Sequence, residues 1–301
     1  MKSADCIKSR NFSDIIFNVI ITALCVFIFT AIAYPLYFII IASISDPNYV
    51  AKGAVTIIPV GIQLDGYKRI FEDTRIWISY RNTIFYSVFG TIVNLAVTLP
   101  AAYVLSRKDF PFRKGLMRYF VITMYFSGGL IPTYLVISGL NLTDKIWVFI
   151  LPFCLNVFYM IVARSFFEST IHIELLESAK LDGCSNWKFF IKIALPISKA
   201  LISVISLYYF VFHWNDFFTG LMYISNKNLL PLQLILREIL LANQVFINGA
   251  GMGGDDGGFA QFIAESIKYG VIIVSTLPLL VIYPFIQKYF EKGVMIGAIK
   301  G

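Results

Sequence analysis

Residues 15–45 read IIFNVIITALCVFIFTAIAYPLYFIIIASIS, a run of 31 residues without a charged side chain between Asp14 and Asp46. About 20 apolar residues in a helix cross the hydrocarbon core of a bilayer, so this run is long enough to span a membrane. It is also much longer than the roughly 7–15-residue apolar region of a cleaved secretion signal. The run therefore predicts a retained transmembrane helix.

The remainder of the chain contains further runs of this kind. With the first run at 15–45, they predict transmembrane helices at about 80–106, 118–140, 146–167, 200–224 and 268–288. The runs lack the alternation of a membrane β-barrel. Only 14% of the 301 residues are charged and the mean hydropathy is +0.75, whereas soluble domains carry about 25% charged residues. The composition excludes a soluble enzyme and predicts an all-α, polytopic bundle of six helices over residues 15–290.

The orientation follows from the basic residues. Segments 1–14, 107–118, 164–199 and 288–301 contain 16 of the 25 Lys and Arg residues. Because cytoplasmic loops are enriched in these residues, both termini, including the tail 291–301, are predicted to be cytoplasmic. The long segments 46–79 and 225–267 then face outward.

Proline and glycine recur inside these runs. They are common in transmembrane helices, but as a set they favour kinked helices around a pathway. The positions are Pro35, Gly90, Pro100, Gly128, Gly129, Pro132, Pro278 and Pro284.

The cytoplasmic segment 168–199 has the pattern of a helical hairpin. Its first half suits a short helix with Thr170 as N-cap and Gly183 as the residue after its C-terminus. A second helix is predicted to start at Ser185 and to end or bend at Pro196. Composition alone is equally compatible with a loop that lies on the membrane surface.

The residues of this segment resemble the EAA signature of importer-type ABC transporter permeases. The matching sequence is ESAKLDG (177–183), followed by Phe189 or Phe190 and by Leu195-Pro196. Two departures are mild: Ser178 replaces an alanine, and His172 stands where the family often has proline.

Other segments extend the resemblance over most of the chain. RSFF (164–167) resembles the family's motif at the end of its fourth helix, and WNDF (214–217) resembles a motif of carbohydrate permeases. The tail from Gln287 to Gly301 is similar to the C-terminus of the maltose-type second permease, and PLQL (231–234) with REIL (237–240) to the branch that imports larger oligosaccharides.

This resemblance implies a type I ABC importer permease in the bacterial plasma membrane, with 168–199 as the loop that couples to the ATPase. It implies that Glu177 contacts a basic residue of the ATPase, that Gly183 allows close backbone approach, and that Asp182 caps or hydrogen-bonds within the hairpin. The full coupling set is Glu177, Ser178, Ala179, Asp182 and Gly183.

The implied partners are a second permease subunit, an ABC ATPase dimer, an extracellular or periplasmic substrate-binding protein, a sugar substrate and membrane lipid, but no nucleic acid. The sequence has no phosphate-binding G-x-x-x-x-G-K-[ST] motif. ATP and Mg²⁺ are therefore expected on the partner ATPase, and no cofactor, metal or catalytic site is expected on this chain. The outward segments are the expected docking surface for the binding protein. The glycine-rich stretch 249–258, with Asp255 and Asp256, is expected to be an extracellular loop.

Sugar passage requires aromatic faces and hydrogen-bonding groups. Residues of these types in the predicted helices are Trp214, Asn215, Asp216, Tyr209, Tyr125, Ser127 and Asn156. For any single Tyr or Trp of this set, membrane anchoring or core packing is the more common role. Asp216 is distinctive because an intramembrane carboxylate is costly unless it is paired or faces water, and a structural hydrogen bond would serve it as well as a substrate.

Other functions fit less well. A membrane-embedded enzyme needs a nucleophile–base pair or a metal cluster, and the chain has two histidines. An ion-coupled secondary transporter needs several ionisable groups within the membrane, and the predicted helices offer Asp216. An ABC permease for another polar solute, such as a glycerol-phosphate ester or a disaccharide, remains the alternative.

Overall fold

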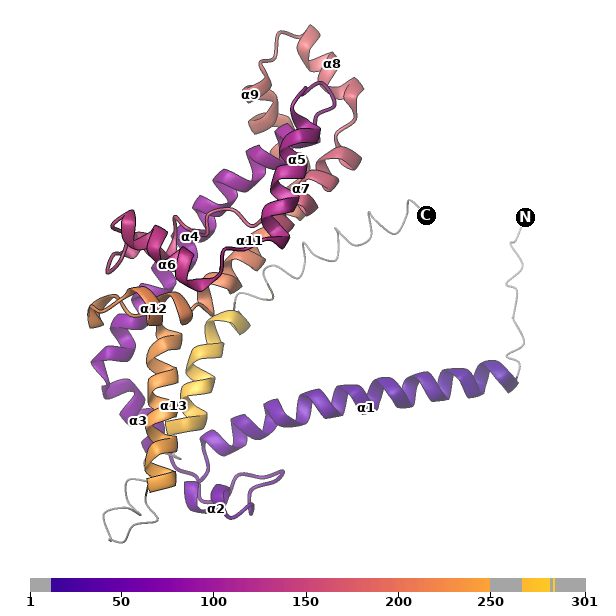
Figure 1. The fold of residues 1–301 in the computed structure, drawn as a ribbon. Coiled ribbons are helices and arrows are strands. Elements are labelled where there is room, and N and C mark those ends of the chain that lie inside the picture. Colours follow the sequence, from indigo (N-terminus) through magenta and orange to yellow (C-terminus); the bar gives the residue numbers. More distant parts are fainter. Residues whose placement is uncertain (1–11, 250–266, 282–283, 285–301) are drawn as a thin grey trace. The chain divides into compact units, whose positions relative to one another are not determined.

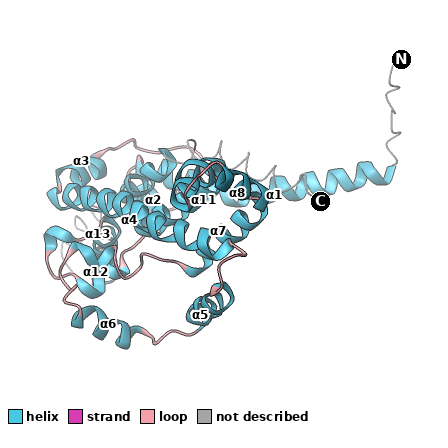
Figure 2. Cartoon of the chain, turned by 90° about the horizontal axis from the view of Figure 1, so that it is seen from above, coloured by secondary structure: helices cyan, strands magenta, loops and turns pink. Residues whose placement is uncertain are grey.

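The computed structural model describes residues 12–249, 267–281 and 284, and every regular element among them is helical (Figure 1, Figure 2). This confirms the predicted all-α class. Three sequence predictions lie outside the described residues: the first 11 residues of the N-terminus, most of the glycine-rich stretch 249–258, and the C-terminal motif 287–301 with the tail 291–301.

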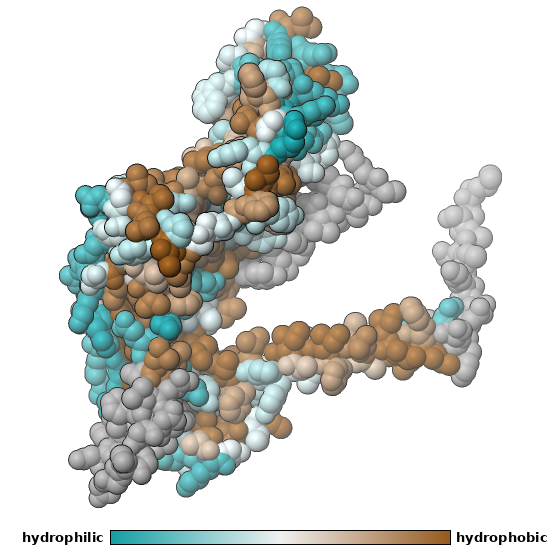
Figure 3. All heavy atoms as spheres, viewed as in Figure 1, coloured by the Kyte–Doolittle hydropathy of each residue, from teal (hydrophilic) through white to brown (hydrophobic). Residues whose placement is uncertain are grey.

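The described chain forms two compact units. The first contains residues 12–70, 243–249 and 267–273. It includes α1 (Phe12–Ser43), α2 (Pro47–Ala51) and most of α3 (Asp65–Glu72). Its buried cluster is small and consists of Ile41, Ala42, Val50 and Val55. Most apolar side chains of α1 are exposed, and Figure 3 shows this helix as hydrophobic along most of its length. Such a surface is suited to lipid as its solvent.

The second unit contains residues 71–242, 274–281 and 284 and is organised around α4 (Thr74–Ser106). This helix packs against α7 (Val157–Thr170) and α11 (Lys199–Trp214). Several side chains that α4 buries are polar, and two of them bond to distant backbone: Asn82 Nδ2 donates to the Asn228 carbonyl, and Asn94 Nδ2 to the Phe153 carbonyl, both at 2.7 Å. Buried polar groups are costly without partners, so these bonds fix α4 against its neighbours.

The remaining helices of this unit are shorter than α4. They are α5 (Arg113–Tyr125), α6 (Leu130–Gly139), η1 (Ile146–Phe149), α8 (Ile173–Leu181), α9 (Asn186–Phe189), η2 (Phe190–Ala194), α10 (Leu195–Ile197), α12 (Phe218–Tyr223), η3 (Lys227–Leu229) and α13 (Leu232–Gly249), whose last residues belong to the first unit.

Two helices of the described chain, α1 and α4, are long and apolar enough to cross a membrane. Two pairs of helices, each joined by a bend, are long and apolar enough when each pair is counted as one span. The chain bends by 115° between α5 and α6, and by 83° between Asn186–Ile197 and α11. A shorter apolar helix, Ile267–Val281, lies within the predicted span 268–288. The total of six transmembrane helices remains a prediction from the sequence.

Three predicted spans differ from the helices in the structure. The span 118–140 is interrupted at 126–129, where Gly129 has a φ of +85°, a conformation that favours glycine. The span 146–167 is α-helical only from Val157, after the cap at Asn156. The span 200–224 is broken at 215–217, between α11 and α12. Uncharged runs show where a chain is apolar, but these local breaks depend on turn and cap residues within the runs.

The segments that the sequence predicts to face outward also differ from simple loops. Residues 225–249 contain η3 and α13, and α4 begins at Thr74, six residues before its predicted start. The early start has a local cause, because Asp73 caps the helix by accepting a hydrogen bond from the Arg75 amide at 2.9 Å.

Candidate functional site

The predicted hairpin of segment 168–199 is present. Its first helix, α8, begins after His172 rather than at Thr170, because α7 continues through Thr170. The end of α8 agrees with the prediction: Gly183 follows the C-cap Asp182 with a φ of +72°. The Cys184 amide donates to the Ala179 carbonyl at 2.9 Å, which completes a glycine-dependent helix end.

The second half of the hairpin begins and ends as predicted. Ser185 is the N-cap of α9, and its hydroxyl accepts a hydrogen bond from the Lys188 amide at 3.3 Å. A π-helical turn, η2, leads to Pro196, which has no N–H to continue the α-helical ladder. The chain then bends by 83° into α11.

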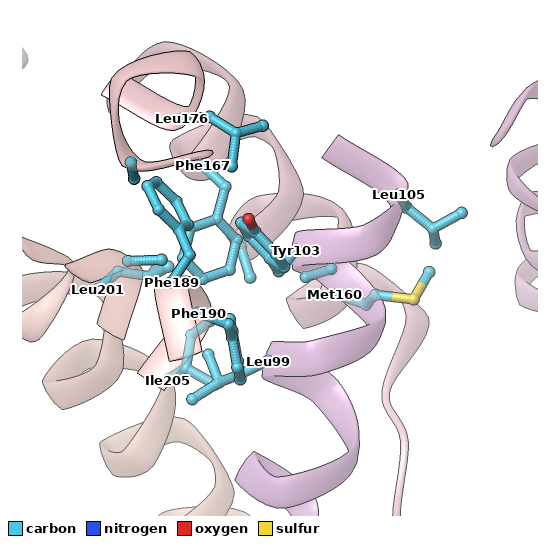
Figure 4. Packing of buried hydrophobic residues seen from close by; sticks show 14 of the residues in the cluster. Leu99, Tyr103, Leu105, Met160, Phe167, Leu176, Phe189, Phe190, Leu201 and Ile205 are labelled. Carbon is cyan, nitrogen blue, oxygen red and sulfur yellow. The ribbon is translucent and has the colours of Figure 1, made fainter. Parts of the chain in front are cut away.

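One face of the hairpin is buried against the ends of other helices. Leu176, Ala179, Phe189 and Phe190 belong to the same buried cluster as Tyr103 of α4, and Figure 4 shows this packing. The rings of Tyr103 and Phe190 have centroids 5.0 Å apart. The aromatic rings therefore fix the hairpin to the bundle.

The other face is open to solvent. Leu181 is 90% exposed and Trp187 is 64% exposed, although both are large and apolar. Of the predicted coupling residues, Glu177, Ser178, Asp182 and Gly183 are exposed, and Ala179 is buried. Among the described residues, the ion pairs do not include Glu177.

Asp182 is the C-cap residue of α8, and it forms hydrogen bonds within the hairpin through its main chain. Its amide donates to the Ser178 carbonyl at 3.1 Å, and the hydrogen bonds found among the described residues do not involve its carboxylate. The nearby hydroxyl of Ser178 donates to the Glu174 carbonyl at 2.9 Å.

A second candidate site is a groove of about 570 Å³ beside α7, α11 and α12. Asn215 and Asp216, two predicted pathway residues, line it. Asp216 Oδ1 accepts a hydrogen bond from the Thr219 amide at 3.0 Å and so helps to start α12. Its buried Oδ2 has no hydrogen-bond partner among the described residues. One carboxylate oxygen is thus structural, and the other is buried without a partner among the described residues.

The aromatic walls of the groove were not identified from the sequence. Tyr159 and Tyr208 stack with centroids 5.4 Å apart and an interplanar angle of 26°. Phe212, Phe217 and Phe218 line the same groove. A signal was present on α11, because Tyr208, Phe212 and Asn215 follow at helical spacing and share one face.

The other predicted pathway residues lie elsewhere. Trp214 and Tyr209 are each 1% exposed. Trp214 Nε1 donates to the Ser275 carbonyl at 3.1 Å, and the Tyr209 hydroxyl accepts a bond from the Asn156 amide at 3.0 Å. Asn156 caps α7, and Tyr125 is 74% exposed near the end of α5. The structure therefore brings only Asn215 and Asp216 of this set into the groove.

Known proteins resemble this chain over most of its length. A family model described as "Binding-protein-dependent transport system inner membrane component" matches residues 76–296. The polygalacturonan/rhamnogalacturonan transport system permease protein YtcP of Bacillus subtilis (strain 168) is 40% identical over 270 residues, which cover 89% of this chain and 92% of that protein. Protein LplC of the same organism is 40% identical over 267 residues, 89% of each chain.

The fold has a solved counterpart. A chain in the crystal structure of a bacterial ABC transporter involved in the import of the acidic polysaccharide alginate aligns with a TM-score of 0.83 and 29% identity, over 93% of this chain and 98% of that chain. The family match includes the hairpin, the groove and the helices that hold them. This chain therefore belongs to the family of binding-protein-dependent transport system inner membrane components, the multi-pass permease subunits of ABC importers.

Proposed function

We propose that this chain forms one half of the pathway of an ATP-driven importer for oligosaccharides. A second permease would form the other half, a binding protein would deliver sugar from outside, and an ATPase dimer would bind the hairpin. ATP and Mg²⁺ would be held by that ATPase, so this chain would need no cofactor. The proposal is supported by the family and by relatives named for the transport of polygalacturonan/rhamnogalacturonan and of alginate.

The observation that carries the coupling role is the division of the hairpin into two faces. Its buried aromatic face fixes it to the bundle, whereas Leu181 and Trp187 hold apolar surface in solvent. Exposed apolar surface beside charged residues is typical of a protein–protein interface. An ATPase groove that received this face could displace the helices attached behind it.

The aromatic groove supports an oligosaccharide as the substrate. Stacked rings present flat apolar faces, which suit the C–H face of a sugar ring, while the exposed side chain of Asn215 can bond to its hydroxyl groups. The groove therefore offers the aromatic faces and hydrogen-bonding groups that a polyhydroxylated ligand needs.

The coupling role can be tested with Glu177→Lys. A lysine would face the expected basic residue of the ATPase, and two like charges about 4 Å apart repel by about 1–4 kcal/mol at effective dielectrics of 80 to 20. We expect weaker co-purification of the ATPase and lower sugar uptake, with normal membrane insertion. Glu177→Gln, which removes the charge without inverting it, should have a smaller effect.

A matched control is Glu72→Lys, the same charge reversal at the end of α3, far along the chain from the hairpin. It should leave ATPase binding unchanged. Wild-type ATPase binding and uptake in Glu177→Lys would show that this part of the hairpin is a passive surface.

A further inference from the structure

The loop between α4 and α5, residues 107–112, contacts the hairpin through Arg107. Arg107 Nη1 donates to Asn186 Oδ1 at 2.9 Å, and Arg107 Nε donates to Asp109 Oδ1 at 2.9 Å. The guanidinium also lies over the ring of Tyr103, 5.9 Å from the centroid. Only 13% of the Arg107 side chain is exposed. The guanidinium is therefore held among these partners.

Asp109 provides a second contact to the hairpin. Its Oδ2 accepts a hydrogen bond from Arg107 Nη2 and lies 3.9 Å from Lys180 Nζ. The hydrogen bonds from Arg107 lower the pKa of the Asp109 carboxyl below its ordinary value, so this group is ionised at neutral pH. The loop thus contacts both helices of the hairpin, α9 through Arg107 and α8 through Asp109.

A neighbouring ionic cluster joins the inner ends of three other helices. Arg113 at the start of α5 and Arg164 in α7 both donate to Glu168 Oε1, at 3.1 and 2.8 Å. Arg164 Nε also donates to the Leu105 carbonyl in the last turn of α4, at 3.2 Å. These contacts connect α4, α5 and α7 without using a residue of the hairpin.

Two clefts flank Arg107. One, of about 400 Å³, lies between the loop and α9, and the other, of about 460 Å³, lies between the loop, α7 and α8. Tyr103, Arg107 and Asp109 line both clefts. Because the spaces on both sides are not filled by side chains, the polar contacts of Arg107 and Asp109 add to the aromatic packing of Tyr103 in holding the loop to the hairpin.

We propose that Arg107 and Asp109 form a latch that makes the hairpin and the α4–α5 loop move as one body during transport. The inference rests on the proposed coupling role of the hairpin. The hairpin continues directly into α11, whereas it reaches α4 and α5 only through space. Packing of Phe190 against Tyr103 already joins the hairpin to α4. The latch adds the α4–α5 loop and, through this loop, α5. Arg107 acts as a positioning residue.

The first test compares Arg107→Ala, Asn186→Ala and the double variant in the complete transporter in proteoliposomes. The ATPase should co-purify as in the wild type, because the exposed face of the hairpin is intact. Sugar transported per ATP hydrolysed should fall by about threefold, and the double variant should be no worse than the stronger single one. Asn186→Asp, which keeps an acceptor for Arg107, should retain the wild-type ratio.

The matched control is Lys108→Ala, which removes a positive charge from the same loop. The hydrogen bonds and ion pairs found among the described residues do not include the Lys108 side chain, so the transport-to-ATP ratio should not change. If Arg107→Ala and Asn186→Ala behave like this control, the latch is wrong. A failure of the latch alone is distinguishable from a failure of the coupling role. In the first case Glu177→Lys still weakens ATPase binding, and in the second it leaves ATPase binding intact.

A second test replaces the ionic contact between Asp109 and Lys180 by a covalent link. Asp109→Cys and Lys180→Cys, in a chain whose four native cysteines are replaced by alanine, would be joined by a reducible bifunctional thiol reagent. If the loop and hairpin move as one body, the cross-linked transporter transports at least as much sugar per ATP as it does after reduction, because reduction leaves the two segments without the Asp109 contacts. Loss of transport on cross-linking, restored by reductant, would show that the two segments separate and would overturn the proposal.

Discussion

The imidazole of His213 in α11 occupies the space that a side chain at Gly90 of α4 would need. A Cβ atom on Gly90 would lie 2.5 Å from His213 Nε2. That nitrogen is also 2.7 Å from Asn94 Oδ1, so the ring is held in place. The close approach of α4 and α11 therefore depends on the missing side chain of Gly90.

Gly90→Ala should destabilise the bundle. Overpacking a filled core costs about 1–3 kcal/mol, which should appear as a lower melting temperature of the detergent-solubilised protein. Gly115→Ala, where a Cβ would meet nothing within 4 Å, is the control and should melt like the wild type. An unchanged melting temperature for Gly90→Ala would mean that α4 and α11 can separate without cost.

Two substitutions at Gly183 should show whether the ATPase contacts this turn, independently of the backbone strain that both substitutions cause. A Cβ there would meet nothing within 4 Å, but the φ of +72° costs a non-glycine residue about 1–2 kcal/mol. Gly183→Ala and Gly183→Leu should therefore lower the stability of the isolated permease equally. If the ATPase backbone approaches this turn, only Gly183→Leu should abolish ATPase co-purification. Equal co-purification of the two variants would exclude a close approach.

The groove and the buried aromatic residues should respond differently to mutation. Trp214→Ala removes a buried ring and its bond to Ser275, so it should cost about 3–5 kcal/mol and reduce the yield of folded protein. Tyr208→Ala and Phe212→Ala alter side chains that are 40% and 42% exposed. Both variants should give the wild-type yield of folded protein and bind the ATPase normally. Their uptake should be weaker, measured as an increased KM for the transported oligosaccharide. Wild-type uptake in both variants would remove the groove from the pathway.

The predicted orientation can be tested by labelling single cysteines at Asn226 and Lys108, both of which are exposed. We expect an impermeant reagent to reach Asn226→Cys in intact cells and Lys108→Cys only after the membrane is opened. The reverse pattern would place the hairpin outside the cell and contradict its coupling role.

The sequence by itself determined the features that depend on neighbouring residues. The apolar run 15–45 indicated a membrane helix, and α1 is long and apolar enough to be one. Gly183 and Ser185 marked the ends of the two hairpin helices, because a helix cap is formed by residues within about four positions of each other. The family resemblance in the same segment was confirmed by the comparisons.

Only the tertiary structure decided which side chains meet. Trp214 and Asn215 are adjacent in the sequence, yet one is buried in the core and the other lines the groove. Arg107 and Asn186 are 79 positions apart, and their hydrogen bond depends on how α4 and the hairpin pack. Helical periodicity tells which residues share a face, but it does not tell what that face contacts. That is decided by the packing of helices that are distant in the chain.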